Sequence, residues 1–329
     1  MSPVRPFVSV VIPVWNEVTH IDGVIRTASA ALEHWGNGEL IVVDNGSGDG
    51  TWELLQHLRE SRPMVLLQNA SASIGELRNI GARAAKGDLL MFLDGDCLVD
   101  PEHLERAWSV LERTGAAATG SPAAPPPDPH WSEDVWFRLH DLDQDGPVRY
   151  LGAANLMIRR QAFESVGGFD STLATGEDAE LALRLRQKGL VIHRAREVRA
   201  FHLGNPKTIP DFCRRQWWHG LGIVRPFEVL DRPLVMSLSH LILSMAGLVA
   251  VLRSPGPATG AFFLGATLIV PVITVVARLR RSRRLVPLAP AIALYWLYFA
   301  CRLAALSTLL FGWPRLPRGW KTPARPIAA

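Results

Sequence analysis

The sequence predicts an α/β domain with a mostly parallel sheet and helices on both faces, followed by a C-terminal helical membrane region. Strand-like runs alternate with segments of helical spacing in the first two thirds of the chain, and three long apolar stretches follow. Strands separated by helices usually pair in parallel. We therefore expect a soluble domain over 1–228, a membrane region over 229–315 and a basic tail over 316–329.

Each element of the soluble domain follows from a local pattern. Apolar and β-branched runs predict strands over Val8–Val14, Glu39–Asp44, Met64–Leu67 and Leu89–Leu93. Helical spacing predicts helices over Glu17–Trp35, Thr51–Arg59, Gly75–Lys86 and Ala179–Lys188, with Gly87 and Gly189 ending the last two. Residues 121–129 are rich in Pro and Ala and predict a surface loop.

The apolar stretches predict transmembrane helices over about 234–252, 258–277 and 286–311. Each is close to the length that crosses a bilayer, and none has an amphipathic face. Core helices of a large soluble protein are the alternative. Five arginines between 278 and 284 place the loop after the second stretch in the cytoplasm, so the soluble domain also faces the cytoplasm.

The third stretch has two possible placements. Arg302 interrupts it, and Arg315, Arg318, Lys321 and Arg325 follow it. It either crosses the bilayer completely, or its last turns lie at the interface or re-enter.

Other classes are disfavoured by composition. The net charge of +4 does not by itself argue for nucleic acid, and no signal peptide is evident. Three cysteines without metal spacing, Cys97, Cys213 and Cys301, fit a reduced compartment and argue against a disulfide framework.

The most informative polar group is Asp94-Gly95-Asp96, which directly follows a buried strand. Two carboxylates around a Gly suit a hard divalent cation, although the same residues also form ordinary turns. Polar or Gly-rich turns also follow the strands ending near Val14 and Asp44. Because ligands of parallel α/β sheets bind beyond the carboxyl ends of the strands, we expect a site at this edge.

Five segments, taken together and in this order, resemble family 2 glycosyltransferases. They are VSVVIPVWNE (8–17), IVVDNGSGDGT (41–51), RNIGARAAKGD (78–88), FLDGD (92–96), and GGFD (167–170) with GEDAEL (176–181). The resemblance covers about residues 8–204. It implies the GT-A fold, which is Rossmann-like, and an inverting enzyme that uses a nucleotide-diphosphate sugar.

The resemblance assigns donor-binding roles to the first strand ends. Pro13 and Glu17 would flank the nucleoside, and Asp44 would bind the base, commonly uracil. The alternatives are a strand-to-helix cap for Glu17 and an Asx-turn for Asp44, and both roles of Asp44 can hold together. Arg78, near a helix start, could hold a diphosphate oxygen or be a solvated surface residue.

Four further residues would carry the chemistry. Asp96 would hold Mg²⁺ or Mn²⁺ while Asp94 touches the sugar or ribose, so that the metal stabilises the departing diphosphate. His202 would be a further ligand of the same metal ion or of the diphosphate. The alternative is a core or hydrogen-bonded histidine. Asp178 matches the position of the catalytic base that deprotonates the acceptor; its alternative is a helix N-cap with a solvated Glu177.

These observations predict a membrane-associated inverting glycosyltransferase of cell-envelope glycans, with its catalytic domain on the cytoplasmic face and a lipid-linked or glycan acceptor. A membrane anchor serving a soluble acceptor would explain the same helices. The rivals are a non-catalytic nucleotide-sugar-binding membrane subunit and a nucleotidyltransferase. The aromatic and basic residues 214–220 form either an interfacial belt or an acceptor-side clamp.

Overall fold

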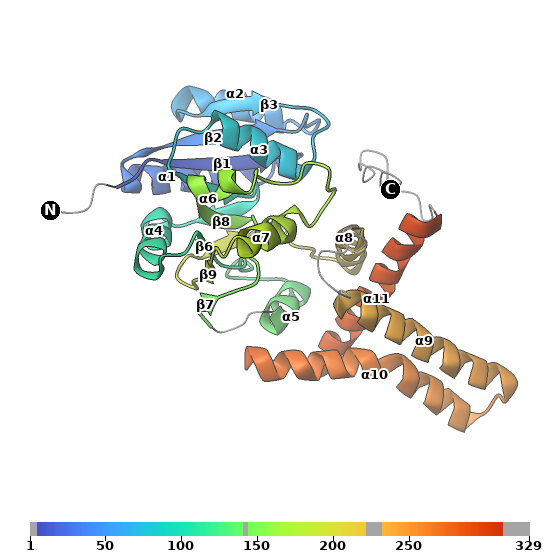
Figure 1. Ribbon diagram of the computed structural model, residues 1–329. Coiled ribbons are helices and arrows are strands. Elements are labelled where there is room, and N and C mark those ends of the chain that lie inside the picture. Colours follow the sequence, from blue (N-terminus) through green and yellow to red (C-terminus); the bar gives the residue numbers. More distant parts are fainter. Residues whose placement is uncertain (1–4, 141–143, 222–231, 312–329) are drawn as a thin grey trace, which may run out of the picture. The chain divides into compact units, whose positions relative to one another are not determined.

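The computed structural model describes residues 5–140, 144–221 and 232–311, which form two compact units (Figure 1). The first unit contains residues 5–126 and 144–204. The second contains residues 127–140, 205–221 and 232–311. The predicted domain boundary at residue 228 and the predicted basic tail lie outside the described residues.

The first unit is built on a mixed sheet with the strand order β3-β2-β1-β4-β8-β6-β9-β7. Its first four strands are parallel, as predicted, and β8 runs antiparallel to both β4 and β6. The strands are β1 (Val8–Val14), β2 (Gly38–Asp44), β3 (Val65–Gln68), β4 (Leu89–Leu93), β6 (Ala118–Gly120), β7 (Gly146–Pro147), β8 (Asn155–Arg159) and β9 (Ile192–Arg194). A separate antiparallel pair is formed by β5 (Cys97–Val99) and β10 (Ala200–His202).

Helices cover both faces of the sheet, which confirms the predicted layering. One core packs the even-numbered residues of β1 against α1 (Ile21–Trp35), α2 (Thr51–Ser61) and α4 (His103–Thr114). The other packs Val11 and β4 residues such as Phe92 against α3 (Ile74–Ala84), α6 (Arg160–Ser165) and α7 (Glu177–Gln187). Alternate residues of a strand point to opposite faces, and this explains the division of β1 between the two cores.

Four predicted helix ends were wrong by a few residues. α2 ends at Ser61 and not at Arg59. α1 begins at Ile21 because residues 17–20 form a turn in which Glu17 O accepts from the amide of His20. α7 begins at Glu177, which puts Asp178 inside its first turn. α3 ends at Ala84, so Gly87 is not its cap; a Cβ on Gly87 would collide with the backbone of Phe7 and Ser9.

The second unit is helical. It contains α5 (Trp131–His140), α8 (Ile209–Gly220), α9 (Arg232–Arg253), α10 (Pro257–Ser282) and α11 (Leu288–Phe311). α9, α10 and α11 are each long and apolar enough to cross a membrane, which confirms the three predicted apolar helices and indicates a membrane protein.

Candidate active site

The predicted carboxylate pair lies where β4 ends in the first unit. Asp94 and Asp96 flank a turn in which the amide of Cys97 donates to Asp94 O at 3.0 Å. Gly95 lies close to the end of β1, since a Cβ on it would be 3.2 Å from Pro13 O, tighter than most such contacts, and 3.5 Å from the Glu17 side chain. This close approach brings the end of β1 against the Asp94–Asp96 turn.

Asp96 and His202 are brought together by the β5–β10 pair. His202 lies opposite Cys97 in this antiparallel ladder, and its Nδ1 is 3.5 Å from Oδ2 of Asp96. Both side chains are buried. Gly204 leaves room for the Asp96 carboxylate, since a Cβ at that position would overlap it.

This group fits a divalent metal ion. Donor atoms of Asp96, Cys97 and His202 all lie within 4.8 Å of one another. A carboxylate oxygen with an imidazole nitrogen is a donor set that Mn²⁺ accepts, whereas a thiol is a soft ligand that Mg²⁺ and Mn²⁺ do not prefer. We therefore regard Asp96 and His202 as the candidate ligands. The thiol of Cys97 lies in this group although the cysteines have no metal spacing in the sequence, and its position next to Asp96 was the signal.

Arg78 connects the carboxylates on the other side of the turn. Its guanidinium is buried and contacts Asp94 Oδ1 at 2.7 Å and Glu177 Oε1 at 2.5 Å. Burial works against the charged guanidinium, but the two carboxylates hold its pKa above the ordinary value, so Arg78 stays charged. The surface alternative for Arg78 is therefore wrong. Its contact with a diphosphate stays a prediction, because two of its nitrogens already bind carboxylates.

Asp178 lies beside this ion-paired group. Its Oδ1 accepts a hydrogen bond from the Ala179 amide at 2.7 Å, and a Cβ on Gly152 would be 3.5 Å from its Oδ2. Burial raises the pKa of Asp178 to about 7, the charge of Glu177 adds to the rise, and the charge of Arg78 opposes it. A carboxylate with a pKa near neutrality can take up a proton in a reaction at neutral pH.

The N-cap alternative for Asp178 was wrong. Gly176 is the N-cap of α7, in a left-handed conformation with φ of 82°. Glu177 is buried and paired with Arg78 instead of being solvated. This role of Glu177 could not be predicted from local sequence, because its partner lies 99 residues away in the chain.

Asp44 is buried at the end of β2, and its carboxylate organises the following turn. Oδ2 accepts from the amides of Gly46 and Ser47 and from Nε2 of Gln68, and Oδ1 accepts from Ser47 Oγ at 2.5 Å. The Asx-turn role is therefore present. Base binding by Asp44 stays a prediction.

The loops after β1 and β2 are joined beside this turn. The amide of Asn16 donates to Ser47 Oγ, and the amide of Gly48 donates to Oδ1 of Asn16. Glu17 is fixed through its amide, which donates to Thr51 Oγ1 at 2.9 Å. Burial raises the pKa of Glu17, and the carboxylates of Asp96 and Asp94 add to the rise. Glu17 is therefore in electrostatic contact with the predicted metal and sugar-binding carboxylates.

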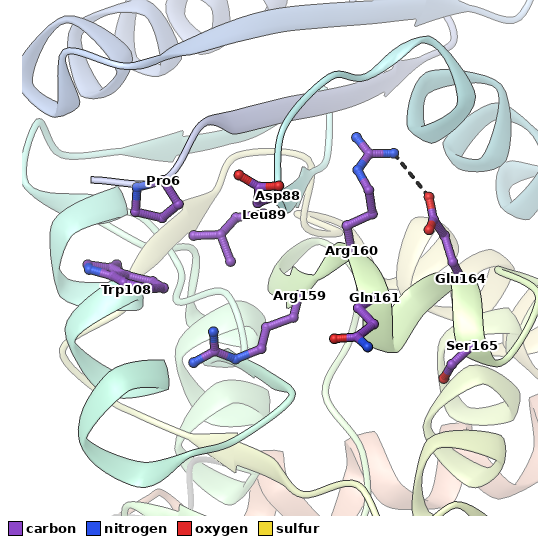
Figure 2. A pocket seen from close by; sticks show the side chains of 9 residues that line it. All are labelled: Pro6, Asp88, Leu89, Trp108, Arg159, Arg160, Gln161, Glu164 and Ser165. Carbon is purple, nitrogen blue, oxygen red and sulfur yellow. Dashed lines mark hydrogen bonds and ion pairs between the residues drawn. The ribbon is translucent and has the colours of Figure 1, made fainter. Parts of the chain in front are cut away.

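A separate depression of about 610 Å³ lies at the opposite edge of the sheet (Figure 2). It is lined by Asp88, Trp108 and Arg159, among others, and Arg159 pairs with Leu89 at the start of β4. The guanidinium of Arg159 donates to the carbonyls of Ala116 and Leu111. This part of the surface therefore has a structural arginine and none of the predicted site residues.

Comparison with known proteins identifies the family of the chain. The sequence model described as glycosyl transferase family 2 matches residues 9–167, and that of glycosyl transferase family group 2 matches residues 89–310. The glycosyltransferase AglE of Haloferax volcanii is 28% identical over 238 residues, which cover 70% of this chain and 77% of AglE.

A shorter match joins the chain to an undecaprenyl-phosphate 4-deoxy-4-formamido-L-arabinose transferase of Pseudomonas savastanoi. It is 34% identical over 118 residues, which are 32% of this chain and 33% of the transferase. Among solved structures, the mannosyltransferase PcManGT of Pyrobaculum calidifontis, in complex with GDP-Man and Mn²⁺, superposes with a TM-score of 0.61. The superposition covers 94% of this chain and 88% of PcManGT at 16% identity, and it supports a common GT-A fold.

The family group 2 model spans two thirds of the sequence, from β4 through the last apolar helix. The motifs 8–17, 41–51 and 92–96 lie on β1, β2 and β4 and the turns that follow them, and 176–181 lies at the start of α7. The chain therefore belongs to the family 2 group of glycosyltransferases.

Proposed function

We propose that this protein is a membrane-tethered inverting glycosyltransferase that moves a sugar from a nucleotide-diphosphate sugar to a lipid-linked acceptor. The observation that carries the proposal is the arrangement of carboxylates along one sheet edge. Asp96 with His202 forms one group, Asp178 with Glu177 forms another, and Asp94 lies between them through its contact with Arg78.

The donor would bind across the ends of β1, β2 and β4. Pro13 and Glu17 would flank the nucleoside, and the Asp44 turn would face the base. The hydrogen bonds between the β1 and β2 loops support this placement, because they hold the two loops at one edge. Asp94 keeps one oxygen beyond its contact with Arg78 and is partly exposed, so it can accept a hydrogen bond from the sugar or ribose.

Asp96 and His202 would hold a divalent ion against the diphosphate. Bound there, Mn²⁺ or Mg²⁺ would neutralise the negative charge that grows on the diphosphate as it leaves. The donor set of one carboxylate and one imidazole supports Mn²⁺ over Mg²⁺. The carboxylate of Glu17, which interacts electrostatically with Asp96, would add negative charge near the ion and favour its binding.

Asp178 would take the proton from the acceptor. Where the acceptor oxygen is a hydroxyl, its proton moves to Asp178 as the oxygen bonds to the anomeric carbon, and the bond from that carbon to the diphosphate oxygen breaks with its electron pair on the diphosphate. One carboxylate base suffices for such a direct displacement, which inverts the anomeric configuration. The raised pKa of Asp178 supports this role, because it increases the basicity of the carboxylate.

The three apolar helices support a substrate met at the membrane. A lipid-linked acceptor must be reached at the bilayer surface, and the acceptor named for the Pseudomonas savastanoi relative is undecaprenyl phosphate. We place the catalytic unit on the cytoplasmic face, because the arginine-rich end of α10 would lie on the cytoplasmic side.

The test is a donor panel with the full-length protein in bilayers. Uridine and guanosine diphosphate sugars are supplied with Mn²⁺, with Mg²⁺ or with a chelator, together with a membrane lipid extract. Release of free nucleoside diphosphate that needs both a metal and the lipid extract is expected. Binding of a nucleotide sugar without any release under all conditions would instead indicate a non-catalytic subunit. Release of pyrophosphate from a nucleoside triphosphate and a sugar phosphate would indicate a nucleotidyltransferase.

A further inference from the structure

The last apolar helix, α11, differs from α9 and α10 in its surroundings. Between 291 and 308, only Ala293 and Trp296 of α11 are exposed within the described structure. In contrast, most residues between 241 and 265 on α9 and α10 are exposed and apolar. α11 is also the least apolar of the three candidate spans. Over these residues α11 is therefore less exposed than the 241–265 part of α9 and α10, while its fully buried share, 28%, equals that of α10.

The second half of α11 is covered by α8. Gly220 of α8 lies so close to Ala305 that a Cβ on it would be 2.5 Å from the Ala305 Cβ. Trp217 donates from Nε1 to Thr308 Oγ1 at 3.0 Å. Arg302, the charge inside α11, donates from Nη1 to the carbonyl of His219 at 2.8 Å. α8 therefore follows α11 up to Thr308.

The first half of α11 is covered by α5. Tyr295 contacts Nε2 of His140 at 3.2 Å, and Trp136 packs against both Tyr295 and Tyr298. α5 also reaches the loop after α10, where Arg138 Nη1 donates to Leu285 O at 3.5 Å. α5 thus lies at the arginine-rich end of α10.

Both covering helices carry charges that do not suit the bilayer interior. On α8, Asp211 and Arg214 form an exposed ion pair at 2.6 Å, and on α5 Asp134 and Arg138 form another at 2.6 Å. A complete crossing by α11 would take α8 and its ion pair into the hydrocarbon, which is strongly unfavourable. An interfacial position lets the same side chains stay in water while Trp296 meets the lipid headgroups.

α9 and α10 have the features expected of a membrane hairpin. They pack side by side, and Gly247 permits this because a Cβ there would be 2.8 Å from Cα of Phe263. Figure 1 shows that α11 leaves this pair in a different direction. α11 packs against residues near the start of α9, such as Met236, and in the second half of α10, such as Val275.

We propose that only α9 and α10 cross the bilayer and that α11 lies in the membrane interface, on the side of the arginine-rich loop, with α5 and α8 on its water-facing side. The surface formed by α5, α8 and α11 thus binds lipid headgroups and not the bilayer core. It follows that the catalytic unit and the C-terminus lie on the same side of the membrane. This inference does not depend on catalysis.

The test is cysteine labelling of the full-length protein in spheroplasts. A chain without its three native cysteines receives one new cysteine, either Ser61→Cys on the catalytic unit, Ser254→Cys between α9 and α10, or Ala328→Cys near the C-terminus. A membrane-impermeant maleimide is added before or after lysis. Ser61→Cys and Ala328→Cys are expected to react alike, and Ser254→Cys oppositely. Opposite behaviour of Ser61→Cys and Ala328→Cys, or equal behaviour at all three sites, would overturn the proposal.

Two native cysteines give an independent measurement. Cys213 on α8 and Cys301 on α11 lie close enough for their side chains to interact. Mild oxidation of native membranes is expected to link them, as seen by mass spectrometry of the joined peptides, while the buried Cys97 stays a thiol. The Cys213→Ser variant is the control. If no disulfide forms between Cys213 and Cys301, the contact between α8 and α11, on which the interfacial placement of α11 depends, is refuted.

Discussion

Replacing Asp178 by Asn is expected to lower the transfer activity strongly without destabilising the protein. Asn keeps the size of the side chain and an oxygen that can accept from the Ala179 amide, but it cannot take up a proton. Because a positioned base contributes roughly 10²–10⁴-fold to such reactions, transfer should fall by at least about 100-fold. Nucleotide-sugar binding should be unchanged.

The same substitution should stabilise the protein at alkaline pH. The pKa of Asp178 rises from an ordinary 3.8 to about 7, mainly because the carboxylate is buried. At about 1.4 kcal/mol for each tenfold change in acid strength, ionised Asp178 lowers the free energy of unfolding by at most about 4 kcal/mol. Asn has no such cost, so its variant should melt several degrees higher at pH 8.

The sign of the pH dependence follows from proton binding. Between pH 3.8 and about 7 the folded protein keeps a proton on Asp178 that the unfolded chain has lost, so stability falls as pH rises through this window. The advantage of the Asn variant should therefore be absent below about pH 4 and complete above about pH 7. The wild-type kcat/KM should rise as Asp178 ionises and level off above about pH 7.

The assays are thermal melting of both proteins in detergent from pH 4 to 9 and donor turnover over the same range. Wild-type-like transfer by the Asn variant would refute the assignment of the base. A lower melting temperature of the variant at pH 8 would refute the electrostatic reasoning.

Three further predictions concern the neighbouring groups. Arg78→Gln should raise the midpoint of the pH–rate profile and cost about 3–5 kcal/mol of stability, because the buried Glu177 and the partly exposed Asp94 lose their partner. Arg83→Gln, which breaks an exposed pair on the same helix, should do neither. His202→Ala should weaken Mn²⁺ binding at least about tenfold in calorimetry with a nucleoside diphosphate, and an unchanged affinity would exclude it as a ligand. Gly204→Ala should displace the Asp96 carboxylate and weaken Mn²⁺ binding too, whereas Gly115→Ala, at a solvent-exposed helix end, should leave it unchanged.

Local sequence patterns were sufficient for most of the fold. The β-branched run of β1 and the helical spacing of α1 depend on residues close together in the chain, so both elements were predicted within a few residues. The error at Gly87 had a different cause. Its role is to let the start of β4 approach Phe7 and Ser9, and this contact joins distant parts of the sequence.

The candidate site was predictable in its residue types but not in its contacts. Asp94 and Asp96 were found because they directly follow a strand. The partners of Arg78 could not be found, because Glu177 is 99 residues away and looked like a solvated residue. Similarly, sequence distance made Cys213 and Cys301 look unrelated, although α8 and α11 bring them together. Apolar length identified α11 as a helix, but it could not reveal which charged helices cover it.

The central claim is direct displacement at the anomeric carbon with Asp178 as the single base. It is tested most directly by NMR of the sugar that the enzyme releases when water replaces the acceptor. With an α-linked nucleotide sugar as donor, the account predicts that the β anomer appears first, before the anomers equilibrate. First appearance of the α anomer would contradict it.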